Sequence, residues 1–402
     1  MPKTHNSIWW GPPRKFTNRI EDRKISWLEL FFDLVYAVVI SRTTHGLAVN
    51  ATPAGILDYA YLIIIIFWGW YNGSQYYDLH GTAGIRTRLM TLWQMMIVAA
   101  LAVTFGSPAD KLIWRVTIAI ATLQIYITYL WWSVGIYDKE HRKYNTPYTV
   151  CYLIAFALII LTLFIPQPYK RMLFWVTLVL NYIPPFLSAT ILKSDHRDFS
   201  LSTSMTERLG TFTIILFGEA ILGVINGVPA QNEISFVVWF CFGLGILTVF
   251  ALWWIFFALI ADRQSREGMA RGSTTAIVYI LALASLGMIG ASFPGLMNDL
   301  SAVALSLSAS RIIFGVSIAL FLSGIVALST LLVYTKEYHD RKRPVQLLLL
   351  GVALLDMAVT TLVSLPLTWY LLWIFLSLAA IIVIITKSWV HIEIRRGVAE
   401  EL

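Results

Sequence analysis

Seven ionisable residues lie inside two long apolar stretches of the sequence, where charged side chains are rare. Such a group in a membrane span is costly unless it is paired or hydrated, and it marks an ion or proton pathway by default. The carboxyl groups of Asp33 and Glu219 could exchange a proton, and nearby arginines could tune them or bind an anion. The candidates for substrate binding or ion coupling are Glu29, Asp33, Arg42, His45, Glu207, Arg208 and Glu219.

The spacing of these residues predicts how they pair. Glu29 and Asp33 are four residues apart and share one face of a helix. When the two stretches are aligned on their first acids, Glu219 lies level with Arg42, and Arg208 lies near Glu29 and Asp33. The alignment predicts two ion pairs, Arg42 with Glu219 in the outer half and Arg208 with Glu29 or Asp33 in the inner half. The alternative is that these pairs only hold the bundle together.

Other side chains in these stretches are expected to shape the helices. Arg42 lies half a helical turn away from Asp33, so one face cannot serve every charge of the first stretch, and we expect protein to surround that helix. The close succession of Pro184 and Pro185 predicts a break or kink. Three glycines of the second stretch allow close helix approach, and most tryptophans are expected to be interfacial anchors. These glycines are Gly210, Gly218 and Gly223.

The elements that position these residues are predicted to be membrane-spanning helices. Only 13% of the 402 residues are charged and 58% are hydrophobic, whereas soluble proteins carry about 25% charged residues. This composition excludes a soluble enzyme, a nucleic-acid-binding protein and a disordered chain. Twelve apolar runs are long enough to span a bilayer. They cover 27–47, 56–77, 87–106, 112–134, 147–165, 170–190, 205–227, 234–260, 274–293, 310–334, 345–364 and 367–388.

The distribution of basic residues predicts the orientation of the chain. With both termini in the cytoplasm, 24 of the 30 Lys and Arg residues fall in or beside cytoplasmic segments. The external segments carry only Lys111, Lys170 and Arg171. This bias follows the positive-inside rule.

Two halves of six spans each resemble one another. Glu29 and Glu207 open similar stretches at an offset of 178 residues, and Arg115 and Arg311 correspond at an offset of 196. Asp78 and Asp262 also correspond, at an offset that lies between these two values. The fold class is therefore an all-α polytopic membrane protein with about 12 transmembrane helices in two six-helix pseudo-repeats of the same orientation. The expected parts are an N-terminal tail (1–26), a first half (27–190), a linker (191–204), a second half (205–388) and a C-terminal tail (389–402).

The sequence contains no motif for a cofactor or a metal ion. The two cysteines, Cys151 and Cys241, lie within apolar runs, so neither a disulfide framework nor a thiolate site is expected. No Walker lysine loop, zinc-protease motif or serine-hydrolase motif is present. We therefore expect no cofactor and no enzymatic activity.

Two segments resemble the signature segments of the low temperature requirement protein A family. They are SWLELFFDLVYAVVISRTTHGL at 26–47 and TERLGTFTIILFGEAILGV at 206–224. The resemblance implies a polytopic protein of the bacterial plasma membrane that is linked to growth in the cold and has no established biochemical activity. The motif residues that it carries over are Glu29, Phe32, Asp33, His45, Glu207, Arg208, Gly218 and Glu219.

A fainter resemblance is to potassium-permeable channels that carry Phe-Ser-Asp in their first helix. Here the comparable residues are Phe31, Phe32 and Asp33, so Phe32 replaces the serine.

The residues favour a secondary transporter of a small solute or lipid, driven by a proton or ion gradient. A cation channel and a structural or signalling membrane protein are the alternatives. The expected partners are the lipid bilayer and an unidentified small solute or ion, without nucleic acid, and the oligomeric state stays open.

Overall fold

The computed structural model describes residues 11–15, 24–82, 84–140, 142–192, 201–228, 235–261, 263–298, 308–334 and 336–400, and the regular structure there is helical. Trp9, Trp10 and Asp262, together with most of the N-terminal tail and the linker, lie outside the described residues. The helices are α2 (Trp27–Val49), α3 (Pro53–His80), α4 (Ile85–Thr104), α5 (Ala109–Tyr137), α6 (Arg142–Leu161), α7 (Tyr169–Tyr182), α8 (Pro184–Leu192), α9 (Thr203–Asn226), α10 (Phe236–Leu259), α11 (Met269–Asn298), α12 (Ala309–Leu331), α13 (Lys336–Leu362) and α14 (Leu367–Glu400).

The helices correspond to the twelve predicted apolar runs, with ends that differ by a few residues except where α13 and α14 extend further. Among the described residues, 11 spans are long and apolar enough to cross a membrane, and α7 and α8 together form one of them. The remaining helix, α2, has 23 residues and carries charged side chains. At about 1.5 Å per residue it is also long enough to cross the hydrocarbon core of a bilayer. The protein is a multi-pass helical membrane protein.

The predicted break in the sixth span is confirmed. α7 ends at Tyr182, and α8 begins at Pro184. Proline has no backbone N–H to donate, and its ring clashes with the preceding turn, so an uninterrupted helix cannot pass through Pro184 and Pro185.

The chain divides into two compact units, each described by itself. Unit 1 contains 1–46, 57–212 and 265–276, and unit 2 contains 47–56, 213–264 and 277–402. The division passes through α2, α3, α9 and α11, whereas the predicted halves end between helices. The first turns of α9 therefore belong to the unit that contains most of α2.

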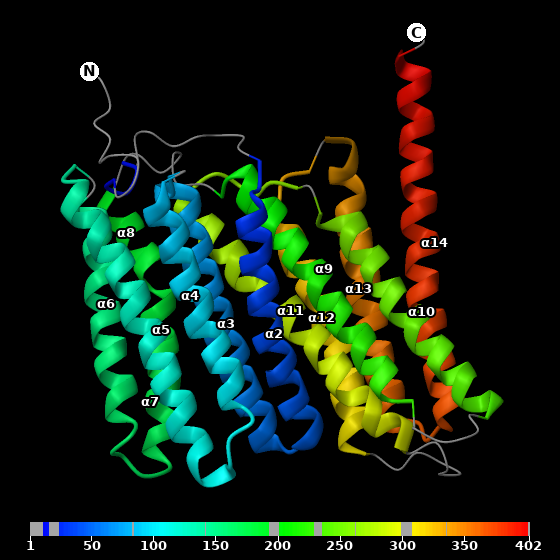
Figure 1. Cartoon of the computed structure of the whole chain (residues 1–402). Coiled ribbons are helices and arrows are strands. Elements are labelled where there is room, and N and C mark those ends of the chain that lie inside the picture. Colours follow the sequence, from blue (N-terminus) through cyan, green and yellow to red (C-terminus); the bar gives the residue numbers. More distant parts are fainter. Residues whose placement is uncertain are drawn as a thin grey trace. The chain divides into compact units, whose positions relative to one another are not determined.

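The core of unit 1 is built from aromatic side chains between neighbouring helices. α5 packs along both α4 and α6, and α6 packs along α7 (Figure 1). Trp131 is fully buried and stacks on Tyr148, with ring centroids 4.4 Å apart. Trp131 is therefore not one of the expected interfacial anchors, because it faces α6, whereas the next residue, Trp132, is half exposed. Cys151 is buried in the same unit.

Protein covers only one face of α2. Phe31, Leu34 and Val38 are each at least half exposed, and Arg42 and His45 are exposed along the same side. The expectation that protein surrounds α2 is therefore wrong. The reason is the spacing of the charges, because the acids near the start of α2 point inward and the side chains half a turn away point outward.

In unit 2, the backbones of α9 and α11 come into close contact. A Cβ atom on Gly223 of α9 would overlap the backbone of Gly290 on α11, whereas Gly210 and Gly218 have no atom near enough to meet one. The predicted close approach is confirmed for Gly223 and is wrong for the other two glycines. Buried Cys241 of α10 belongs to this unit.

This contact predicts different effects for two glycine substitutions on the same helix. Gly223→Ala should lower the free energy of unfolding by about 1–3 kcal/mol, because the helices must separate to admit the methyl group. Gly218→Ala should be neutral or should stabilise by up to about 1 kcal/mol, since alanine favours a helix. Unfolding of the purified protein in detergent measures both variants. Equal melting temperatures for the two would contradict the assigned contact.

Candidate functional site

A buried cluster of two carboxylates and one guanidinium joins α2 to α9 within unit 1. Arg208 Nη2 lies 2.5 Å from Asp33 Oδ1, and Arg208 Nη1 lies 3.4 Å from Glu29 Oε1. Arg208 Nε also donates to Asp33 Oδ2 at 3.4 Å, so Asp33 is held by two bonds. The three side chains are each at most 1% exposed. The predicted inner ion pair is confirmed, and it includes both acids.

Aromatic side chains hold the cluster in place. The indole of Trp70 on α3 donates to Asp33 Oδ1 at 2.7 Å. The guanidinium lies 5.6 Å from the ring centroids of both Phe32 and Trp70. Trp70 also stacks on Phe212, one turn beyond Arg208, with centroids 4.5 Å apart. Cation–π contacts of this kind stabilise a desolvated guanidinium and fix its position.

Glu29 has a second role at the start of α2. Ser26 donates to Glu29 Oε2 through its hydroxyl at 2.9 Å and through its backbone N–H at 3.0 Å. Ser26 and Glu29 thus form a capping box, in which a serine and a glutamate three residues later satisfy the first turn of a helix. The two oxygens of Glu29 therefore have different partners, the helix start and Arg208.

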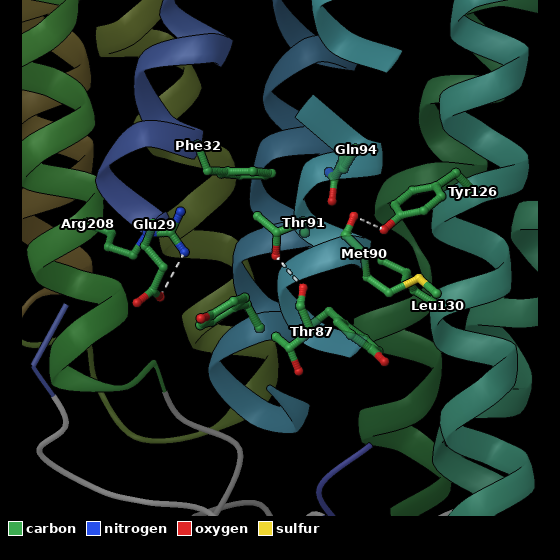
Figure 2. A pocket seen from close by; sticks show the side chains of 12 residues that line it. Glu29, Phe32, Thr87, Met90, Thr91, Gln94, Tyr126, Leu130 and Arg208 are labelled. Atoms are coloured by element: carbon green, nitrogen blue, oxygen red, sulfur yellow. Dashed lines mark hydrogen bonds and ion pairs between the residues drawn. The ribbon is translucent and has the colours of Figure 1, made fainter. Parts of the chain in front are cut away.

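A small cavity of about 20 Å³ reaches Glu29 and Arg208 from α4 and α5 (Figure 2). A site of about 10–15 Å³ is enough for one water molecule if polar groups surround it. Thr87, Thr91 and Gln94 supply polar atoms on its α4 side. Gln94 is held in place because its amide donates to the Tyr36 hydroxyl at 2.8 Å and to the Gly69 carbonyl at 3.0 Å. A water molecule here could carry a proton to Glu29.

The other predicted site residues do not join this cluster. Arg42 and His45 are exposed on α2, and Glu207 is exposed on α9 next to buried Arg208. Glu219 is half-buried and belongs to unit 2, whereas Arg42 belongs to unit 1. The Arg42–Glu219 pair would join the two units and stays a prediction.

A network of uncharged polar groups in unit 1 was not predicted. Asn72 Oδ1 accepts from the Tyr152 hydroxyl at 2.7 Å and from the Trp131 indole at 3.2 Å. Gln124 and Asn181 form a reciprocal amide pair with bonds of 2.9 and 3.0 Å. Single neutral amides in apolar runs give little signal in the sequence. The position of Asn181 just before the proline break was the only available hint.

Unit 2 holds a buried carboxylate of its own on α13. Asp356 accepts a bond from the Trp373 indole at 3.1 Å and one from the Ser377 hydroxyl at 2.9 Å, both on α14. These bonds join α13 to α14, which supports a structural role for Asp356.

Comparison with known proteins places the chain in a family. It is 25% identical over 284 residues to an uncharacterized protein from Rhizobium meliloti (strain 1021), and the matched region covers 67% of each chain. No solved structure matches. The sequence profile of the bacterial low temperature requirement A protein matches residues 24–386, which include α2, α9 and every helix between them. The chain therefore belongs to the bacterial low temperature requirement A (LtrA) family.

Proposed function

We propose that this protein is a secondary transporter of the bacterial inner membrane that couples movement of a small solute or lipid to protons or another ion. The supporting observation is the single guanidinium of Arg208 held between two carboxylates inside membrane helices. Buried ionisable groups of this kind mark proton and substrate pathways in membrane proteins. The proposal includes no catalytic step and no cofactor.

In this proposal the two acids have different tasks. Glu29 lines the water-sized cavity, whereas Asp33 is held by Arg208 and Trp70. A proton that arrives through the cavity reaches Glu29 and weakens its attraction to Arg208. The guanidinium keeps its ion pair with Asp33 in the meantime, so protonation does not leave an unpaired buried cation. Glu29 thus becomes the main candidate for proton exchange, and Asp33 anchors Arg208.

The same cavity favours a carrier over a channel. Steady conduction requires a continuous polar path through the membrane. The volume of this cavity is about 20 Å³, which is room for about one water molecule. A carrier instead exposes its site to one side at a time. In the structural alternative, Glu29 does not exchange protons, and its role is to complete the capping box that starts α2.

Glu29→Gln separates coupling from capping. Glutamine can accept the same bonds from Ser26, because glutamate and glutamine both complete a capping box, but it cannot release a proton. We expect proteoliposomes with the variant to show proton uptake no faster than empty liposomes, measured with a pH-sensitive dye under K⁺ or Na⁺ gradients. The wild-type protein should show transient, saturable uptake.

Glu207→Gln is the matched control, since it removes an exposed carboxylate next to Arg208. This variant should transport like the wild type. Sustained ohmic current in the wild type would favour the channel instead. A folded Glu29→Gln protein that takes up protons at the wild-type rate would contradict the proposed role of Glu29.

A further inference from the structure

A larger cavity lies at the other end of unit 1, where α3, α5 and α7 begin. It has a volume of about 210 Å³, many times what one water molecule needs. Its walls are mostly apolar and include Leu62, Val116, Ile120 and Phe174. The predicted orientation places this end of the helices on the external side of the membrane.

Basic side chains gather at this cavity. Lys170 and Arg171, in the first turn of α7, line it, and Lys111, in the first turn of α5, precedes the lining residue Leu112. These three are the only Lys and Arg residues in the predicted external segments. Asp58 lies across the cavity and pairs with Arg171 at 3.2 Å.

These positions are electrostatically unfavourable for cations. The start of a helix carries a partial positive charge, so lysine and arginine in a first turn oppose the helix dipole. Among the lining residues, the two cations Lys170 and Arg171 share one acid, Asp58. An anion at the mouth of the cavity would offset both effects.

Two aromatic rings form part of the apolar wall of the cavity. Tyr61 and Phe174 both line it, and their ring centroids lie 4.9 Å apart. Tyr61 is only 7% exposed, so its ring is held firmly by the surrounding protein. This wall offers a rigid apolar surface to an acyl chain.

We propose that this cavity binds an anionic lipid, with one acyl chain against the apolar walls and the headgroup at Lys111, Lys170 and Arg171. The apolar walls of the cavity favour an acyl chain, and the basic residues at its mouth favour a negatively charged headgroup. The site is separate from the Arg208 cluster and does not rest on the proposed transport activity.

Photo-crosslinking in nanodiscs tests the site. The probe is phosphatidylglycerol with a diazirine in one acyl chain, and the comparison probe is phosphatidylcholine with the same chain. We expect phosphatidylglycerol to label peptides with residues 57–62 and 112–120 preferentially. Lys111→Gln combined with Lys170→Gln should lower this labelling by an order of magnitude, since each cation near a membrane surface is worth about fivefold in binding. That pair of changes leaves the Arg171–Asp58 bond in place.

Val116→Trp fills the cavity, and Ile125→Trp places the same side chain at an exposed position of the same helix. The first variant should lose the labelling and the second should keep it. Equal labelling by both probes, or unchanged labelling in Val116→Trp, would overturn the proposal in favour of ordinary boundary lipid. Displacement of the probe by excess inorganic phosphate would overturn it in favour of a simple anion site.

Discussion

Arg208→Gln is expected to lower the free energy of unfolding by about 3–5 kcal/mol, because it leaves the buried carboxylates Glu29 and Asp33 without the cation they share. Glutamine can replace some hydrogen bonds of the guanidinium but not its charge. It also lacks the planar cation that contacts the rings of Phe32 and Trp70. Chemical or thermal unfolding in detergent, with size-exclusion chromatography to verify folding, measures the loss.

Arg115→Gln is the matched control for this substitution. Arg115 is also in a membrane span, but it is exposed and its side chain donates to Ser107. Its loss should change the stability by no more than about 0.5 kcal/mol, as is usual for an exposed substitution. If Arg208→Gln were no more destabilising than Arg115→Gln, the Arg208 cluster would not contribute substantially to the packing of α2 against α9.

Neutralising the whole cluster is expected to restore stability without restoring transport. The variant Glu29→Gln, Asp33→Asn, Arg208→Met removes all three charges, so no buried charge stays unpaired. Replacement of a buried ion pair by well-packed apolar residues is often neutral or stabilising by about 1–4 kcal/mol, whereas removal of one partner alone is strongly destabilising. We therefore expect the triple variant to unfold at a higher temperature than Arg208→Gln and to show no coupled proton uptake in proteoliposomes.

The triple variant distinguishes a transporter from a scaffold. The three changes lie in contact, so their effects on stability should be strongly non-additive. A scaffold would regain its function when its stability returns. Recovery of both properties would therefore contradict the proposed transport role, whereas recovery of stability alone would agree with it.

The sequence was sufficient to predict the helices and the Arg208 cluster because both depend on large energies. Long apolar runs can satisfy their backbone in a membrane only as helices, so their existence follows from composition. Buried charges need partners, so aligning two charged stretches brought Arg208 to Glu29 and Asp33. The same reasoning gave the break at Pro184, since two successive prolines remove two backbone donors and clash with the preceding turn.

Features that depend on packing and on neutral polar groups could not be predicted in this way. The exposed face of α2 depends on which neighbours cover it, and the spacing of Asp33 and Arg42 only indicated that the two point in opposite directions. The bond from Trp70 to Asp33 joins residues 37 positions apart, and the Gln124–Asn181 pair joins residues 57 positions apart. Nothing in the local sequence of either residue specifies its distant partner.

The locations of the two cysteines have a practical consequence for spectroscopy. Cys151 and Cys241 are both buried, one in each unit, so soluble thiol reagents have poor access to them. A cysteine introduced at an exposed position should therefore accept a fluorophore or a spin label selectively in the otherwise native chain. Each unit can in this way carry its own reporter without prior removal of the native thiols.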